Sequence, residues 1–230
     1  MKQQIFYIDK TPAVLYGEKS TSVYLYLHGQ SGNKLEGKAF SETAIIKGYQ
    51  VLAIDLPEHG ERNDEEKLLP WTVLSELEII KQFLYSNWSN VSIRANSIGV
   101  WFSMLSFANN NINKCLFVSP VLDMEKLISD MMKWALVTEN DLQQKREIQT
   151  DFGQTLSWDY LSFVRQNPIT QWSIPTKILY ASKDNLVQRE TVEKFVERFQ
   201  CGLSIMENGE HWFHTDEQLE YLKTWEEKMM

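Results

Sequence analysis

The sequence has few of the residues that mark several common classes of protein. Only two of its 230 residues are cysteines, Cys115 and Cys201, and they do not form a CxxC pair. The four histidines show no metal-ligand spacing. The sequence therefore predicts two buried free thiols rather than a disulfide framework, and no metal site.

Long apolar runs and an excess of basic side chains are also missing. No apolar run approaches the roughly 18 residues that a membrane-spanning helix needs, and the N-terminus MKQQIFYIDK lacks the layout of a signal peptide. We therefore expect a soluble, cytoplasmic protein with no membrane partner. The 23 basic and 31 acidic side chains give a net charge of -8. Because no basic face is left to follow a phosphate backbone, a nucleic-acid partner is not expected.

Short apolar runs bounded by turn residues are what the sequence does contain. They lie at 22–28, 50–56, 91–97, 114–119, 176–181 and 203–206, and they are typical of buried parallel strands. The segments between them have helical period. Two runs at 5–8 and 13–16 predict an antiparallel edge hairpin. Alternating strands and helices predict an α/β fold, with a mostly parallel sheet covered by helices on both faces.

One long segment interrupts this alternation. The residues from 122 to about 170 are too many for a bare loop in a compact domain. They include helix-like pieces, one of which Asn140 and Gln143 could open by N-capping. We predict a single domain over residues 1–230 with a helical cap inserted at about 122–170. The cap residues expected to contact substrate are Met131, Trp134, Trp158 and Tyr160. Alternatively, such side chains pack the cap onto the body.

A candidate nucleophile follows the strand at 91–97. There Ala95-Asn96-Ser97-Ile98-Gly99 leads from an apolar strand into an apolar helix. Small residues two before and two after a serine allow the tight strand-to-helix turn called a nucleophile elbow. Ser97 would then lie at a helix N-terminus, where backbone N–H groups favour developing negative charge.

A serine nucleophile needs a base, and the histidines after the last strand are the candidates. His211 lies in the loop that follows Gly209, whereas His214 directly precedes a helix that Thr215 and Gln218 would cap. We prefer His211 because that loop can reach the serine. His214 is the alternative.

The carboxylate that orients this base is assigned to Asp184, directly after the strand at 176–181. In isolation, Asp184 with Asn185 would be interpreted as a turn. However, Ser97, Asp184 and His211 each follow a different strand, in the order of the α/β-hydrolase triad. We therefore predict that these three residues are catalytic.

The fourth part of such a site is an oxyanion hole. His28-Gly29-Gln30-Ser31-Gly32 follows the first parallel strand, and its glycines allow backbone N–H groups to point inward. We expect the amides of Gln30 and Ile98 to be the two donors. His28 is then expected to hold the loop rather than to carry a proton.

In this order, LYLHGQSGNK, VLAIDLPEHGER, ANSIG, ILYASKDNLV and NGEHWF resemble the landmark motifs of α/β hydrolases, over residues 24–213. The likeness is to small bacterial serine esterases of the dienelactone-hydrolase and prolyl-oligopeptidase-like branch. It implies a single α/β-hydrolase domain, the triad Ser97, Asp184 and His211, and a hole amide from Gln30. It also implies that His59 belongs to a structural turn. The chain departs from the family at Ala95, where the elbow usually opens with Gly.

The sequence thus predicts a serine hydrolase that cleaves a small or medium apolar or aromatic ester and needs no cofactor. A thioesterase or amidase would use the same triad. A non-catalytic ligand-binding protein of this fold is the alternative from another class. The sequence has no Gly-rich phosphate loop, so it does not favour a phosphate enzyme. The oligomeric state is not predicted.

Overall fold

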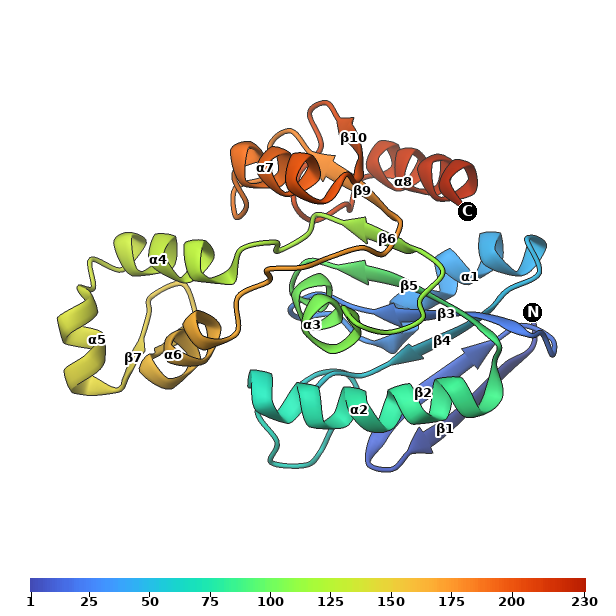
Figure 1. Ribbon diagram of the computed structural model, residues 1–230, viewed down its shortest axis with the longest axis horizontal. Coiled ribbons are helices and arrows are strands. Elements are labelled where there is room, and N and C mark those ends of the chain that lie inside the picture. Colours follow the sequence, from blue (N-terminus) through green and yellow to red (C-terminus); the bar gives the residue numbers. More distant parts are fainter. The chain divides into compact units, whose positions relative to one another are not determined.

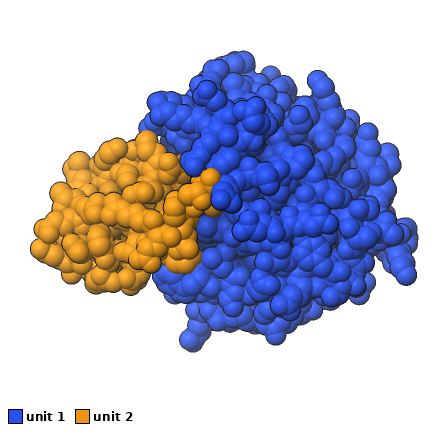
Figure 2. Space-filling view, viewed as in Figure 1, with its two compact units in different colours: residues 1–122, 171–230 blue, residues 123–170 orange.

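The computed structural model describes residues 1–230, which form two compact units (Figure 2). The first unit consists of residues 1–122 and 171–230, and the second of residues 123–170. The second unit is an insertion in the chain between strands β6 and β9 of the first. The insertion expected at about 122–170 contains this unit, and its action as a cap stays a prediction.

The first unit is built on an eight-stranded sheet with the order β1-β2-β4-β3-β5-β6-β9-β10. Its strands are β1 (Gln3–Ile8), β2 (Thr11–Tyr16), β3 (Ser22–Leu27), β4 (Gln50–Ile54), β5 (Asn90–Asn96), β6 (Cys115–Val118), β9 (Thr176–Ala181) and β10 (Gly202–Met206). The strands from β4 to β10 across this order pair in parallel, whereas β1 pairs antiparallel with β2, and β2 with β4. The predicted mostly parallel sheet and its antiparallel edge hairpin are therefore confirmed.

Helices cover both faces of this sheet (Figure 1). The helices of the first unit are η1 (Lys34–Glu36), α1 (Gly37–Ile46), α2 (Pro70–Asn87), α3 (Ile98–Phe107), α7 (Arg189–Phe199) and α8 (Asp216–Met229). On one face α1 and α8 contact each other, and on the other α2 contacts α3. Side chains alternate along β3, so Tyr24 and Tyr26 join the core cluster with Phe40 of α1 and Trp225 of α8.

The second unit contains three helices and a short hairpin: α4 (Met124–Trp134), α5 (Glu139–Lys145), β7 (Glu147–Gln149), β8 (Thr155–Ser157) and α6 (Trp158–Gln166). The expected start of its middle helix is wrong. Thr138 is the N-cap of α5 and forms a capping box with Asp141, and Asn140 already lies inside the helix. Oγ1 of Thr138 accepts from the N–H of Asp141, and the carboxylate of Asp141 accepts from the N–H of Thr138.

Both cysteines are free. Cys115 is buried on β6, and Cys201 is half-buried just before β10. Burial raises the pKa of the Cys201 thiol to about 11, so this thiol carries little thiolate near neutral pH. No helix is both long and apolar enough to span a lipid bilayer.

Candidate active site

Ser97 occupies a strained turn between β5 and α3. Its φ of 47° and ψ of -118° are uncommon for a residue with a side chain. The turn is held from both sides, because Ser97 N–H donates to the carbonyl of Val118 and Val121 N–H donates to the carbonyl of Ser97, each at 3.1 Å. Strained backbone of this kind persists where the surrounding structure fixes it.

Gly99 shows why the elbow needs a small residue after the serine. A Cβ atom at Gly99 would lie only 2.5 Å from the carbonyl oxygen of His28. Similarly, a Cβ atom at Gly29 would lie 3.1 Å from Cβ of Ser97. The loop after β3 therefore packs directly against the elbow, and its backbone runs beside the serine.

Folding brings the three predicted catalytic side chains into hydrogen-bond contact. The Oγ of Ser97 lies 2.9 Å from Nε2 of His211. On the far side of the ring, Nδ1 of His211 lies 2.6 Å from Oδ2 of Asp184. Because the carboxylate can only accept, Nδ1 carries the proton and Nε2 is left to accept from the serine hydroxyl. A chain of hydroxyl, imidazole and carboxylate of this kind can activate a serine as a nucleophile.

Asp184 is held so that its carboxylate cannot swing away. Its side chain is fully buried, with 0% exposure. While Oδ2 faces His211, Oδ1 accepts from the backbone N–H groups of Leu186 at 2.8 Å and Val187 at 2.9 Å. The turn interpretation is therefore correct, and the same turn orients the carboxylate. The catalytic role of Asp184 stays a prediction.

The two candidate histidines occupy different environments. His211 is in the loop between β10 and α8, and its side chain is 13% exposed. His214 is exposed; its ring stacks on that of Trp212, and its Nδ1 lies 2.7 Å from the carbonyl of Trp212. Thr215 caps α8 as predicted, by accepting from the N–H of Gln218. Only His211 contacts Ser97.

The amides proposed for the oxyanion hole are both unused within the protein. Neither the N–H of Gln30 nor that of Ile98 has a hydrogen-bond acceptor. Gln30 is exposed in the loop after β3, and Ile98 is the first residue of α3. Gly29, the residue before Gln30, packs against Cβ of Ser97, and Ile98 directly follows Ser97, so both amides belong to segments next to the serine. They are available to a negatively charged oxygen.

His28 holds the oxyanion loop, as the sequence suggested. Its Nε2 accepts from the N–H of Leu56 at 3.0 Å, and its Nδ1 donates to the carbonyl of Gly29 at 2.7 Å. Burial lowers the pKa of His28 to about 4. The ring is therefore neutral near pH 7, in agreement with its accepting Nε2.

Sequence reasoning missed two residues whose contacts support the site. It treated His59 only as part of a turn, yet its Nε2 accepts from the N–H of Ser31 at 2.9 Å. It also gave no role to Arg94, which is buried on β5 and binds Glu226 of α8 at 2.8 Å. Arg94 also donates to Oδ1 of Asn96, the residue before the nucleophile. A buried arginine in an apolar strand was a signal that a partner existed.

The predicted substrate-contacting residues lie in the second unit. Met131 and Trp134 are on α4, and Trp158 and Tyr160 are on α6. The ring of Trp134 lies 6.2 Å from that of Phe152 in an edge-to-face arrangement. Burial raises the pKa of the Tyr160 hydroxyl. Their contact with a substrate stays a prediction.

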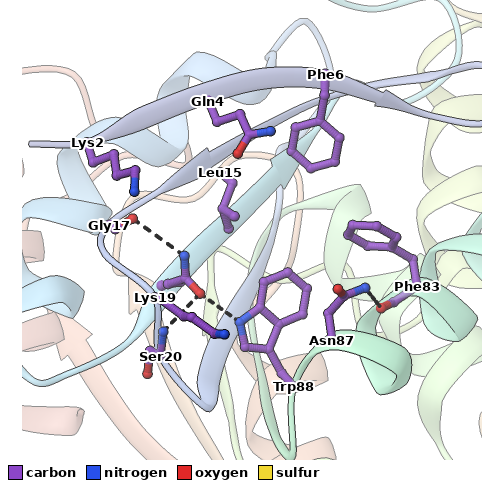
Figure 3. A pocket seen from close by; sticks show the side chains of 11 residues that line it. Lys2, Gln4, Phe6, Leu15, Gly17, Lys19, Ser20, Phe83, Asn87 and Trp88 are labelled. Atoms are coloured by element: carbon purple, nitrogen blue, oxygen red, sulfur yellow. Dashed lines mark hydrogen bonds between the residues drawn. The ribbon is translucent and has the colours of Figure 1, made fainter.

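A separate cavity of about 460 Å³ lies at the amino ends of the parallel strands, away from the carboxyl ends that Ser97 and His211 follow. Figure 3 shows the side chains that line it. Gln50, the first residue of β4, lines it together with Phe6, Phe83 and Trp88, and two of its other lining residues are Lys2 and Lys19. Ser97 and His211, in contrast, follow the carboxyl ends of β5 and β10. The cavity contains no nucleophile paired with a base. Nowhere in the chain are three His, Cys, Asp or Glu side chains grouped to hold a metal ion.

No protein-family model matches the chain, and no curated protein matches it in sequence. Solved structures do resemble it. Est1E from Butyrivibrio proteoclasticus with ferulic acid bound superposes with a TM-score of 0.79 at 17% identity, covering 99% of this chain and 97% of that one. Mouse alpha/beta hydrolase domain-containing protein 10 gives 0.77 at 12% identity, covering 100% and 98%.

A thioesterase domain from the curacin biosynthetic pathway is similar over a comparable length. Its TM-score is 0.65 at 17% identity, covering 98% of this chain and 99% of that domain. At such identities the likeness concerns the fold, and the narrower esterase branch stays a prediction. The sheet order, the helices on both faces and these structural neighbours show that this chain has the α/β-hydrolase fold.

Proposed function

We propose that this protein is a serine hydrolase that cleaves carboxylic esters through an acyl-enzyme. The observation that carries the proposal is the continuous hydrogen-bond chain from Ser97 through His211 to Asp184, with distances of 2.9 and 2.6 Å. The strained elbow under Ser97 and the two unused amides beside it support the same function.

The geometry supports a two-step reaction. Ser97 Oγ attacks the ester carbonyl while Nε2 of His211 takes the hydroxyl proton, and the amides of Gln30 and Ile98 stabilise the resulting oxyanion. His211 then returns the proton to the departing alcohol, and Asp184 stabilises the transient imidazolium. In the second step His211 removes a proton from water, which attacks the acyl carbon. His211 then returns that proton to the departing Oγ of Ser97, which releases the acid and restores the serine hydroxyl. Ester and water give acid and alcohol, so no cofactor is required.

We propose an apolar or aromatic acyl group as the substrate's recognised part. The exposed Trp134 and Phe152 of the second unit offer aromatic contact surface. Est1E, whose fold this chain shares, is the protein that holds ferulic acid in its solved structure. An aromatic carboxylic ester is therefore the first substrate class to test, with thioesters and amides as comparisons.

The test is hydrolysis of p-nitrophenyl acetate, p-nitrophenyl butyrate and an aromatic acyl ester by the wild type and by Ser97→Ala. We expect the variant to lose about three or more orders of magnitude in kcat. Ser106→Ala is a matched control, because Ser106 lies on the following helix and its buried hydroxyl has no partner. A fluorophosphonate should label the wild type and the control but not Ser97→Ala. If Ser97→Ala retains most of the parent rate, the proposed function is wrong.

A further inference from the structure

Two histidines outside the triad tie the oxyanion loop to its neighbour in a reciprocal way. His28, in the loop after β3, accepts the N–H of Leu56 in the loop after β4. His59, in the loop after β4, accepts the N–H of Ser31 in the loop after β3. Each loop thus supplies one histidine and receives one. The two rings lie 5.1 Å apart.

Each ring is itself fixed by a second bond. Nδ1 of His28 donates to the carbonyl of Gly29, and Nδ1 of His59 donates to the carbonyl of Pro57, both at 2.7 Å. Both side chains are buried. Every nitrogen of the two rings is therefore used, and used only by the neutral Nδ1–H tautomer. Protonating either ring would place an N–H against a backbone N–H.

The hydrogen bonds from these two rings reach the residues on either side of Gln30, whose amide is the proposed oxyanion donor. His28 bonds to Gly29, the residue before Gln30, and His59 bonds to Ser31, the residue after it. The side chain and amide of Gln30 are not held directly. The position of its N–H therefore depends on the two neighbours. The His59 ring holds the N–H of Ser31, and the carbonyl of Gly29 accepts from the His28 ring and from the N–H of Gly32 at 3.1 Å.

We propose that His28 and His59 form a clamp, defined by these two residues, that positions the Gln30 amide to stabilise the oxyanion. They are positioning residues, since neither contacts Ser97 or His211 through a hydrogen bond. This inference rests on the proposed function and names a further determinant of that same site. A charged pair also joins the same two loops: Asp55 accepts from the backbone N–H and from Nζ of Lys34, each at 2.7 Å.

Because the oxyanion exists only beyond the ground state, a displaced donor should lower kcat rather than weaken substrate binding. Removing one oxyanion donor outright costs about 10²–10³ in kcat. A displaced amide should cost less. We expect His59→Leu to lower kcat by roughly 10- to 100-fold, with KM changed by less than about threefold.

Rescue by a conservative variant separates positioning from packing. In His59→Gln, the side-chain oxygen can take the place of Nε2 and still accept the N–H of Ser31, so kcat should stay within about fivefold of wild type. Amide hydrogen exchange measured by NMR should show Ser31 exchanging at least about tenfold faster in His59→Leu than in His59→Gln.

Gln50→Leu is the stability control. Gln50 is buried at the amino end of β4, where its Oε1 accepts from Nε1 of Trp88 at 2.9 Å (Figure 3). This variant should lose stability but keep kcat within about twofold, because it lies at the far end of the strands.

Three results would overturn the clamp: His59→Leu retaining wild-type kcat, His59→Gln falling as far as His59→Leu, or Gln50→Leu losing as much kcat as His59→Leu. The proposed function fails in a different way, when the wild type neither hydrolyses any ester nor reacts with a fluorophosphonate. An active wild type with an insensitive His59→Leu variant would refute only the clamp.

Discussion

Replacing Asp184 by Asn tests the link on which the base depends. The carboxylate uses both of its oxygens: Oδ2 faces Nδ1 of His211 at 2.6 Å, and Oδ1 accepts from Leu186 and Val187. An asparagine has one oxygen and one NH₂ group. If its oxygen keeps the two backbone bonds, its NH₂ group faces Nδ1 of His211.

That exchange inverts the tautomer of the imidazole. Nδ1 becomes the acceptor and the proton moves to Nε2, which then cannot accept the proton of Ser97. With the geometry intact and the tautomer wrong, we expect kcat to fall by about 10⁴. This corresponds to about 5 kcal/mol of transition-state stabilisation, at 1.36 kcal/mol for each factor of ten.

The assay is kcat for p-nitrophenyl butyrate, with urea unfolding of each variant to confirm that the fold is retained. Asn185→Ala, at the exposed neighbouring position, is the matched control and should remain within about twofold of wild type. ¹⁵N NMR of the His211 ring should report the proton on Nδ1 in the wild type and on Nε2 in Asp184→Asn. A folded Asp184→Asn variant that keeps more than one tenth of wild-type kcat would refute this reasoning.

Three further predictions concern stability. Burial lowers the pKa of His28 from 6.5 to about 4. The contribution of the neutral ring to folding stability is therefore complete above pH 6.5 and is lost as the pH falls toward 4. In urea unfolding, the wild type should lose roughly 2–3 kcal/mol more than His28→Gln between pH 7 and 4.5. Gly99→Ala forces a Cβ to within 2.5 Å of the His28 carbonyl oxygen. It should lower the free energy of unfolding by about 1–3 kcal/mol and remove most of the esterase rate. Unchanged unfolding and kcat would show that the elbow can relax. Glu226→Leu leaves the buried charge of Arg94 without its carboxylate partner and should cost about 3–5 kcal/mol in denaturant unfolding. Most of this loss should be recovered in the Arg94→Met/Glu226→Leu double variant. Equal losses in both variants would contradict a paired buried charge.

The order of elements was available from the sequence because it depends on local pattern. Apolar runs of strand length and segments of helical period alternate along the chain, and neither property needs distant contacts. The small residues Ala95 and Gly99 around Ser97, and the capping of α8 by Thr215, are likewise local. The same pattern set apart the insertion, since a strand-to-strand segment of that length is too long for a bare loop.

Local pattern failed where two signals competed within a few residues. The sequence predicts Asn140 as an N-cap, but Thr138 starts α5 because its side-chain oxygen and the carboxylate of Asp141 each accept the other residue's N–H. Local pattern also cannot place β4 between β2 and β3, because strand order is set by which faces and edges pair in space.

Local pattern in the sequence is enough to nominate a serine in an elbow, a carboxylate after one strand and a histidine after another. The folded chain is needed to bring His211, rather than His214, to 2.9 Å from Ser97, and to let His28 and His59 accept backbone N–H groups across two loops. Those contacts join residues 28–114 positions apart in the chain. The physical reason is that hydrogen bonds depend on distance and angle to within a few tenths of an ångström, and only the packed sheet fixes these.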